Sequence, residues 1–260
     1  MTSVPPPPSP AYTAQELMIA VASREIRDRE LVFVGMRLPI VAYAVARNTH
    51  APNARGLFEV GLKRDQAAST YLGTMGDPPN VAGALWATRM SNVMALMAQG
   101  VVDLGVIGGA EVDRYGNLNT SYVGPPERPR VKLPGSGGGA DIAILSRRWV
   151  TLMTHERRRL VERVSFVTSP GHGDGSPGWR RRHGLLGGGP AAIITTLCVF
   201  RFPAEGGEAY LDTLHPGSTL ADVRQATGWE VTAGAGVGET PPPTEAELHE
   251  IRLRLAVGPR

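Results

Sequence analysis

One carboxylate in the sequence ends an apolar segment. Residues 56–65, GLFEVGLKRD, place Glu59 after two apolar residues and two positions before Gly61. Apolar residues followed by glycine predict a short strand that ends near the carboxylate. At such a position Glu59 is either a solvated or ion-paired structural acid, or it takes part in a reaction as nucleophile or base.

Two glycine-rich segments could supply backbone amides to an anion or to a thioester carbonyl. Gly108 and Gly109 end the apolar segment 102–109, and residues 135–140 read GSGGGA. The second segment matches the dinucleotide pattern GxGxxG/A, but that pattern should follow a strand directly and open a helix. Because the proline-containing RPRVKLP precedes it, we expect a flexible loop or, better, a loop that binds an anion or a carbonyl group.

Other catalytic and metal-binding motifs are missing from the sequence. It contains no GxxxxGK phosphate loop, no GxSxG nucleophile turn and no HExxH spacing among its histidines, so we expect no metal site. The single cysteine, Cys198, excludes an intrachain disulfide and a CxxC site. His172 lies in the polar segment 171–184 and is expected to be a solvated loop residue.

Arginine occurs in two clusters, Arg157–Arg159 and Arg180–Arg182, in a chain with a formal net charge of +3. Each cluster is either a solvated surface or an anion site, for example for a phosphorylated cofactor. We expect no nucleic-acid partner, because no known reader motif or interleaved aromatic residues accompany the clusters. The sequence contains neither a bilayer-spanning apolar stretch nor a secretory signal, which predicts a soluble cytoplasmic protein without a membrane partner.

Strands and helices that could position these residues alternate over roughly the first 110 residues. Strands are expected at 31–35, 54–61 and 102–109, between helices that begin near Thr13 and Pro39 and a helix over residues 80–100 that ends at Gly100. This alternation predicts an α/β fold with a mostly parallel sheet flanked by helices. Active sites in such sheets lie at the carboxyl ends of the strands, where Glu59 and the Gly108–Gly109 pair are both expected.

The rest of the chain is expected to complete one domain over residues 12–260, after a proline-rich, disordered segment 1–11. The expected elements there are strands at 142–145, 149–153 and 164–168, a strand pair within 191–202, a helix within 220–231, a linker at 232–243 and a last helix from Thr244 to Leu255. We find no internal repeat.

Several ordered motifs together resemble a known family. They are THAPN before LFEVG, then IGGAEVDRYGNLN, GSGGGADIA, MTHERRR, VTSPG and LHPGSTLADVRQATG. With these motifs the chain resembles the β subunit of family I coenzyme A transferases of the glutaconate type, from about residue 13 onward. The resemblance implies that family's open α/β sheet.

The resemblance also implies roles for individual residues. The family's catalytic glutamate lies in an SENG-like or ESG motif, which Glu59 and Gly61 match, although Phe58 and Val60 replace polar residues. The family's coenzyme A loop, GxGGxxD, and its glycine pair beside the active site match a second set of residues. These are Gly135, Gly137, Gly138 and Asp141 for the loop, and Gly108 and Gly109 for the pair.

The implied activity is transfer of coenzyme A from an acyl-CoA to a carboxylic acid, including dicarboxylic acids, through a thioester on Glu59. Coenzyme A is then a substrate, and no permanently bound cofactor or metal is expected. The implied partner is an α-type subunit in an α2β2 or α4β4 assembly. Alternatives on the same scaffold are an acyl-CoA hydrolase, including a ring-opening one, an acyl-CoA decarboxylase, or a non-catalytic subunit that completes a partner's site.

Overall fold

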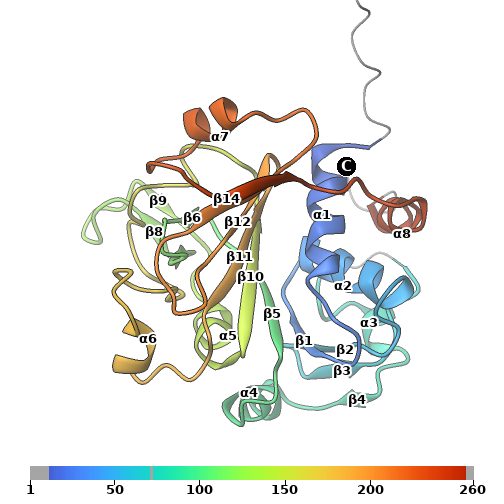
Figure 1. The fold of residues 1–260 in the computed structure, drawn as a ribbon. Helices are drawn as coiled ribbons and strands as arrows, with labels where there is room; N and C mark the ends of the chain where they lie inside the picture. Colours follow the sequence, from blue (N-terminus) through green and yellow to red (C-terminus); the bar gives the residue numbers. More distant parts are fainter. Residues whose placement is uncertain (1–11, 71–72, 256–260) are drawn as a thin grey trace, which may run out of the picture.

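A ten-stranded mixed sheet runs through the chain (Figure 1). The structure, a computed structural model, describes residues 12–70 and 73–255, so the segment 1–11 that was expected to be disordered lies outside the described residues. In spatial order the strands are β14 (Thr232–Glu239), β13 (Tyr210–Leu214), β12 (Cys198–Arg201), β11 (Pro190–Thr195), β10 (Arg148–Met153), β5 (Leu104–Gly108), β1 (Leu31–Val34), β2 (Arg55–Phe58), β3 (Leu62–Arg64) and β4 (Trp86–Ala87).

The centre of this sheet is parallel and its flanks are antiparallel. Strands β2, β1, β5, β10 and β11 run in one direction, whereas β3, β4, β12 and β13 continue the two sides with antiparallel pairs. The predicted α/β fold with a mostly parallel central sheet is therefore confirmed. Since the central strands are parallel, their carboxyl ends share one edge of the sheet, as the sequence pattern predicts for Glu59 and Gly108.

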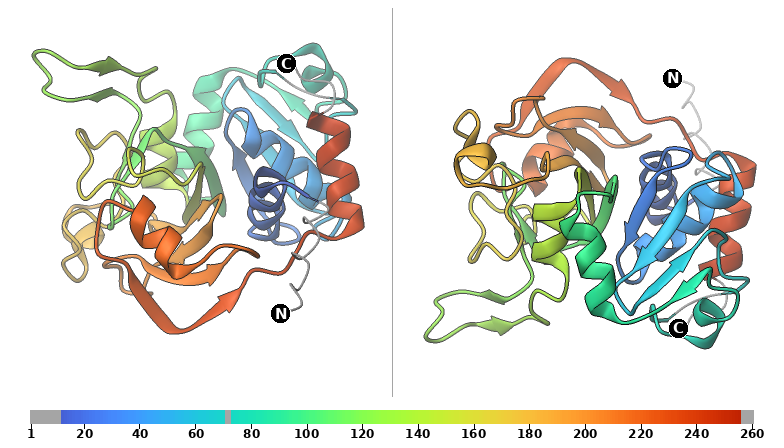
Figure 2. Two further views of the ribbon diagram at one scale, coloured as in Figure 1. Left: turned by 90° about the horizontal axis from the view of Figure 1, so that it is seen from above. Right: turned by 90° about the horizontal axis from the view of Figure 1, so that it is seen from below.

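Helices cover both faces of the sheet. The described helices are α1 (Ala14–Arg24), α2 (Leu38–Asn48), α3 (Pro78–Val81), α4 (Met90–Ala98), α5 (Gly139–Leu145), α6 (Trp179–Arg182), α7 (Leu220–Ala226) and α8 (Glu245–Leu255). Figure 1 shows α1, α2 and α8 on one side of the central strands and α5 on the other. Two short pairs, β6 (Glu111–Val112) with β7 (Leu118–Asn119) and β8 (Tyr122–Val123) with β9 (Val131–Lys132), lie outside the large sheet, and the β8–β9 hairpin extends from the body in Figure 2.

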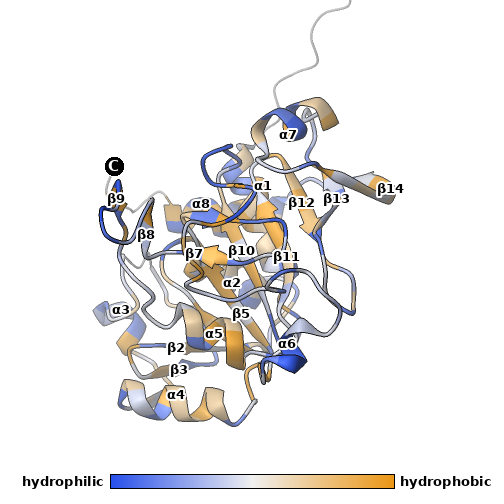
Figure 3. Cartoon of the chain, turned by 90° about the vertical axis from the view of Figure 1, so that its left-hand side faces the viewer, coloured by the Kyte–Doolittle hydropathy of each residue, from blue (hydrophilic) through white to orange (hydrophobic). Residues whose placement is uncertain are grey.

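Alternation along the buried strands divides the core into two halves. In β1, Val32 and Val34 belong to the cluster formed with α1, α2 and α8, whereas Leu31 and Phe33 belong to the cluster formed with α4, α5 and α7. Successive side chains of a strand point to opposite faces, so both halves are apolar along the whole strand. Figure 3 shows this as hydrophobic colour on the central strands, in contrast to the hydrophilic helix α6.

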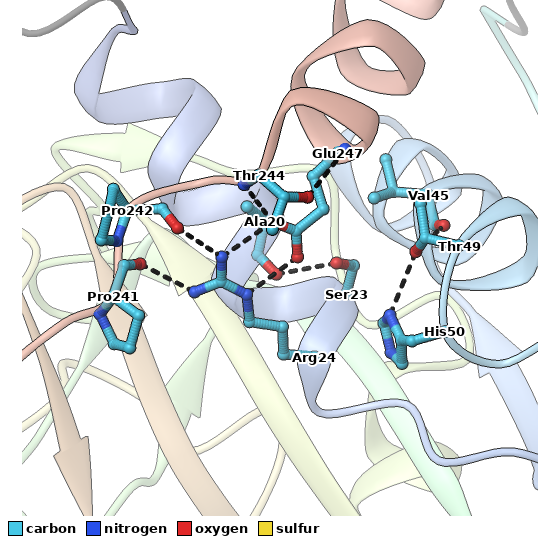
Figure 4. Close-up of polar contacts among 10 residues, drawn as sticks. All are labelled: Ala20, Ser23, Arg24, Val45, Thr49, His50, Pro241, Pro242, Thr244 and Glu247. Atoms are coloured by element: carbon cyan, nitrogen blue, oxygen red, sulfur yellow. Dashed lines mark hydrogen bonds and ion pairs between the residues drawn. The ribbon is translucent and has the colours of Figure 1, made fainter.

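The last helix is held against the first by a forked arginine (Figure 4). Arg24 at the end of α1 donates to both carboxylate oxygens of Glu247, at 2.8 and 2.7 Å, and to the carbonyl oxygens of Pro241 and Pro242. Glu247 also accepts from the backbone of Thr244, as the capping pattern at 244–247 predicts. Bidentate, partly buried pairs of this kind are stronger than ordinary surface ion pairs.

Four expectations about secondary structure are wrong. The helix expected over residues 80–100 exists only as α4, and its upstream half contains strand β4 after a turn at Gly83, which has φ +73°. Residues 142–145 belong to helix α5 rather than to a strand, since a short apolar run fits a buried helix turn as well as a strand. Residues 164–168 contain no strand, and the expected linker 232–243 contains the edge strand β14, paired in parallel with β13. Glycine-rich TAGAGVGE has no local strand signal, so its pairing depends on the neighbouring strand.

No helix in the described part of the chain is long and apolar enough to cross a bilayer. Among residues 12–70 and 73–255, no three histidine, cysteine, aspartate or glutamate side chains lie together so that they could hold a metal ion.

Candidate active site

Glu59 occupies the tip of the hairpin that joins β2 to β3. Phe58 and Leu62 are paired, so the loop has three residues, and the Gly61 amide donates to the Phe58 carbonyl at 3.0 Å. Gly61 has φ +102°, and a Cβ at this position would lie 1.9 Å from the Thr88 carbonyl oxygen. Three-residue hairpin loops commonly end in a residue of positive φ. Gly61 therefore shapes the turn that presents the half-buried Glu59 side chain.

The side chain of Tyr43 in α2 binds both strands of the hairpin. Its hydroxyl accepts the Gly56 amide at 2.9 Å and lies 3.1 Å from the Arg64 carbonyl oxygen, to which it donates. A Cβ on Gly56 would lie 2.8 Å from the tyrosine ring, so glycine is required for this approach. Burial raises the pKa of Tyr43 to about 12, which keeps the hydroxyl protonated. Tyr43 thus joins both strands of the hairpin to the core.

The Glu59 carboxylate lies against the glycine loop that precedes α5. A Cβ on Gly138 would lie 3.0 Å from Glu59 Oε2, and one on Gly137 would lie 4.0 Å from Oε1. Met94 of α4 packs at the same place, because its Cε would lie 3.3 Å from a Cβ on Gly138. Among the described residues Glu59 has no hydrogen-bond or ion-pair partner. Within this part of the chain Glu59 therefore forms no ion pair, so it is not the ion-paired structural acid that the sequence also allowed.

The outer residues of the same loop have different surroundings. Gly135 has φ +103° and its amide donates to the Thr120 carbonyl at 2.8 Å, so it shapes the loop. Asp141 is exposed in the first turn of α5. The loop opens a helix, as in the dinucleotide pattern, but the short strand β9 and two further residues precede the loop instead of a core strand. The structure thus brings Gly137 and Gly138 to Glu59. Gly135 lies earlier in the loop, and Asp141 lies in helix α5.

The glycine pair Gly108–Gly109 lies at the end of β5. Phe33 of β1 pairs with Leu57 on one side and with Gly105 on the other, so Glu59 and Gly108 end at nearly the same level, two strands or ~10 Å apart. Gly108 is exposed, and together with Gly109 it lines a cavity of about 410 Å³ at the carboxyl edge. Glu59 and the glycine pair therefore lie at the same edge of the sheet, with the end of one strand, β1, between them.

Two residues near the site carried no recognisable functional signal in the sequence. Met94 reads as one apolar residue of an amphipathic helix, and Tyr43 reads as one core residue of another. Arg64 is similar: it is buried and donates to the carbonyl oxygens of residues 66, 79, 80 and 82, which holds the segment after the hairpin. Only contacts between distant segments identify these supporting roles.

The expectation that His172 is solvated is wrong. Its side chain is buried, and burial followed by the nearby Arg180 charge lowers the pKa of His172 to about 4. Arg180 is itself buried and donates to carbonyl oxygens of residues 143, 170, 171 and 187, so this member of its cluster holds the surrounding loops. In the other cluster, Arg158 and Arg159 pair with Glu156.

A second buried polar network links the ends of β11 and β12. His155 Nδ1 lies 2.9 Å from Thr195 Oγ1 and its Nε2 lies 3.0 Å from Thr227 Oγ1. The Cys198 thiol lies 3.7 Å from His155 Nδ1, and burial raises the pKa of this thiol to about 12. Burial also lowers the pKa of His155 to about 4 and that of His215 below its ordinary value. The fold thus keeps these imidazoles neutral and the thiol unreactive.

Acidification is expected to destabilise the chain through these histidines. In the unfolded chain His155 takes up a proton near pH ~6.5, whereas in the folded chain it does so only near pH 4. The contribution of the neutral, buried His155 to the free energy of unfolding is therefore fully present above pH ~6.5 and decreases as the pH falls below that value. We expect a loss of up to ~1.4 kcal/mol per pH unit from His155 between these values. Urea unfolding at several pH values measures it, with alkylation of Cys198 as a second report of opening.

His155→Gln should flatten this pH slope even if it lowers the stability at every pH. His249→Gln is the matched control, because His249 is exposed on α8 and its removal should leave the slope unchanged. Equal slopes in wild type and His155→Gln would contradict the assignment of a neutral buried imidazole.

The fold and the site define a class: an open α/β sheet with a glutamate and glycine loops at the carboxyl edge. A family model for coenzyme A transferases matches residues 15–226. The β-type subunit of 3-oxoadipate CoA-transferase from Pseudomonas knackmussii is 35% identical over 243 residues, covering 93% of this chain and 93% of that protein. The chain therefore belongs to the coenzyme A transferase family, and within it to the β-subunit type.

Solved structures agree with this assignment. The crystal structure of glutaconate coenzyme A-transferase from Acidaminococcus fermentans superposes with a TM-score of 0.87 at 30% identity, covering 93% of this chain and 94% of that chain. The decarboxylase AibA/AibB also superposes, with a TM-score of 0.79 at 29% identity over 93% of this chain and 94% of that chain. The resemblance inferred from the motifs is confirmed.

Proposed function

We propose that this chain carries the nucleophile of a two-subunit coenzyme A transferase, and that Glu59 is that nucleophile. The observation that carries the proposal is a half-buried carboxylate at the carboxyl edge, beside Gly137 and Gly138 and without a partner among the described residues. An unpaired carboxylate is available for attack, and glycines leave room for a thioester beside it.

The first half of the reaction moves coenzyme A onto the protein. A Glu59 oxygen attacks the carbonyl carbon of the acyl-CoA, the carbon–sulfur bond breaks, and an acyl-glutamyl anhydride and a thiolate form. The thiolate then attacks the glutamyl carbonyl carbon. The anhydride bond breaks, the first carboxylic acid leaves as its carboxylate, and a glutamyl-CoA thioester remains.

The second half repeats these steps with another acid. The carboxylate of the acceptor attacks the glutamyl thioester and releases the thiolate, which then attacks the acceptor's carbonyl carbon in the new anhydride. The products are the new acyl-CoA and the free Glu59 carboxylate. Coenzyme A is a substrate throughout, and the acceptor is a carboxylic acid, for which a dicarboxylic acid is our preferred class.

Backbone amides of the glycine loops suit the charge that develops during these steps. Each tetrahedral intermediate carries an oxyanion that amide donors can stabilise, which Gly108–Gly109 and Gly137–Gly138 could provide. The anhydride needs protection from water, and the apolar neighbours Phe58 and Met94 favour this.

The isolated chain is expected to be inactive and to gain activity with an α-type partner. Val60, Leu85 and Met90 are large exposed apolar residues around the hairpin, which favours a partner on this face. An obligate interface should bury more than ~2,000 Å². Size-exclusion chromatography with light scattering and a transfer assay, on the chain alone and with its partner, test this. Full turnover by the chain alone would contradict it, and the α2β2 or α4β4 state would follow from the measured mass.

The hydrolase and decarboxylase alternatives predict different products. The resemblance of this fold to the decarboxylase AibA/AibB is the observation that keeps the second open. The complex is incubated with acyl-CoA with and without acceptor acid, and products are followed by mass spectrometry. A transferase needs the acceptor and accumulates glutamyl-CoA without it. Free coenzyme A or carbon dioxide formed without acceptor, and without an adduct, would favour an alternative over our proposal.

A further inference from the structure

The cavity at the Gly108–Gly109 pair extends beyond the residues assigned to the transfer reaction. It has a volume of about 410 Å³, within the ~300–1,000 Å³ range of small-molecule sites. Its walls come from the first turns of α1 and α2 and from the carboxyl ends of β5, β10 and β11. Segments far apart in the sequence thus surround one space beside the candidate active site.

The cavity lies at the point in the sheet where the strand order reverses. From β1 the chain continues to β2 on one side, and it later returns across β1 to form β5 on the other side. The ends of β1 and β5 remain close, because the Gly35 amide donates to the Val106 carbonyl at 3.1 Å. In open α/β sheets, ligands bind in the crevice outside the carboxyl ends of strands at such a reversal.

Arg37 is an unusual residue in the wall of this cavity. It follows β1, precedes α2 and has φ +69° and ψ −119°, a conformation that suits glycine. Backbone outliers of this kind are strained and cluster at ligand-binding sites. The Arg37 side chain is exposed, and among the described residues its guanidinium has no hydrogen-bond or ion-pair partner. A strained position therefore presents an unpaired cation to the cavity.

The rest of the lining combines positive potential with apolar walls. Arg159 also lines the cavity, although Glu156 partly balances its charge at 3.2 Å. Helix α2 begins at the cavity without a side-chain cap, which adds the positive end of its dipole. Methionines 18, 36 and 153 with Leu152 supply the apolar surface. Methionine side chains adapt their shape to flexible apolar ligands.

We propose that this cavity binds the acyl chain of a substrate that ends in a second carboxylate, and that Arg37 pairs with this carboxylate. The methionines would contact the methylene chain, and the reacting carboxyl would lie toward Gly108–Gly109 and Glu59. The phosphates of coenzyme A fit this cavity less well, because charged phosphates gain nothing from contact with apolar walls. This inference rests on the proposed function and deepens it, by naming the cavity that holds the acyl chain and the residue that selects the second carboxylate.

The test compares two acceptor acids that differ only in the second carboxylate, glutarate and pentanoate, in the complex with the α-type partner. Arg37→Gly should raise the KM for glutarate ~10- to ~100-fold, as expected for loss of a charge-assisted hydrogen-bonded pair. The kcat for glutarate and the KM for pentanoate should change little, and Arg37→Lys should recover part of the glutarate KM.

The chain offers a matched control in Arg29. This exposed arginine also has positive φ, at +68°, but it lies before β1 at the opposite edge of the sheet. Arg29→Gly removes the same charge at another position of positive φ that does not line the cavity, so it should leave both KM values unchanged. Glycine fits the backbone at both positions, so both variants should keep or exceed the wild-type melting temperature.

Binding measurements separate this inference from the proposed function. Glutarate, pentanoate and coenzyme A are each titrated calorimetrically into the Glu59→Gln complex, with and without Arg37→Gly. Selective loss of glutarate binding supports the inference even if the complex catalyses no transfer. Equal glutarate binding in both complexes overturns it, as does a loss confined to coenzyme A, which would assign Arg37 to a phosphate.

Discussion

Glu59→Gln is expected to abolish coenzyme A transfer while leaving the protein folded and bound to its partner. Glutamine keeps the shape of the side chain, which has no described partner to lose, but its amide cannot attack a thioester. Removing the nucleophile of a covalent mechanism costs ~10,000-fold or more in kcat. Glu59→Ala should behave in the same way. Steady-state transfer assays on the two complexes, with circular dichroism and light scattering as checks of fold and assembly, measure the effect.

The proposed covalent intermediate offers a direct test of the same residue. Wild-type complex incubated with acyl-CoA and no acceptor should carry coenzyme A on Glu59, detected as an added mass on the peptide that contains residues 56–65. Borohydride should reduce this thioester and hydroxylamine should cleave it. The adduct should be absent from Glu59→Gln and Glu59→Ala.

Glu59→Asp tests the geometry rather than the charge. It shortens the side chain by one methylene, and misplacement by about 1 Å can cost ~100-fold. Near wild-type transfer by Glu59→Ala would remove Glu59 from the chemistry and return it to a structural role.

Gly61→Ala is expected to reduce transfer ~100-fold without touching any reacting atom. A Cβ here would lie 1.9 Å from the Thr88 carbonyl oxygen, and φ +102° disfavours every residue with a side chain. The turn must therefore shift, and Glu59, two residues earlier, shifts with it away from Gly138. The loss should appear in kcat, with reduced formation of the glutamyl-CoA adduct in single-turnover experiments.

Gly217→Ala is the matched control for this substitution. Gly217 also has positive φ, at +83°, but no described atom lies within 4 Å of its Cβ position apart from its chain neighbours. It should lose stability through backbone strain alone, roughly 1 kcal/mol, and keep its kcat. If the two variants lose equal activity, strain in any glycine turn explains the effect and the positioning role of Gly61 is wrong.

These two predictions separate chemistry from positioning at one hairpin. In the proposed mechanism the carboxylate supplies the attacking atom, while Gly61 and Tyr43 determine where that atom lies relative to the glycine loop. The second is a tertiary effect, because Tyr43 belongs to α2 and Gly138 precedes α5.

Local pattern was sufficient to predict the central elements of the fold. Apolar runs and glycines located β1, β2 and β5, and capping pairs located the starts of α1 and α8, because these signals depend on residues within one turn or one strand. The alternation then predicted a parallel sheet with Glu59 and Gly108 at one edge. Motif order predicted the family, which the comparisons confirm.

Only the tertiary structure decided which residues meet at that edge. Gly138 lies about eighty positions beyond Glu59 in the sequence, and no local pattern states that the two lie in contact. Helix α5 and strand β14 were missed because a short apolar run and a glycine-rich run acquire their conformation from neighbouring strands. Arg37 reads as an ordinary surface arginine until its backbone angle and its place in the cavity are known. The physical reason is common to all three: contacts across the sheet, rather than residue type or spacing, determine the conformation and surroundings of these residues.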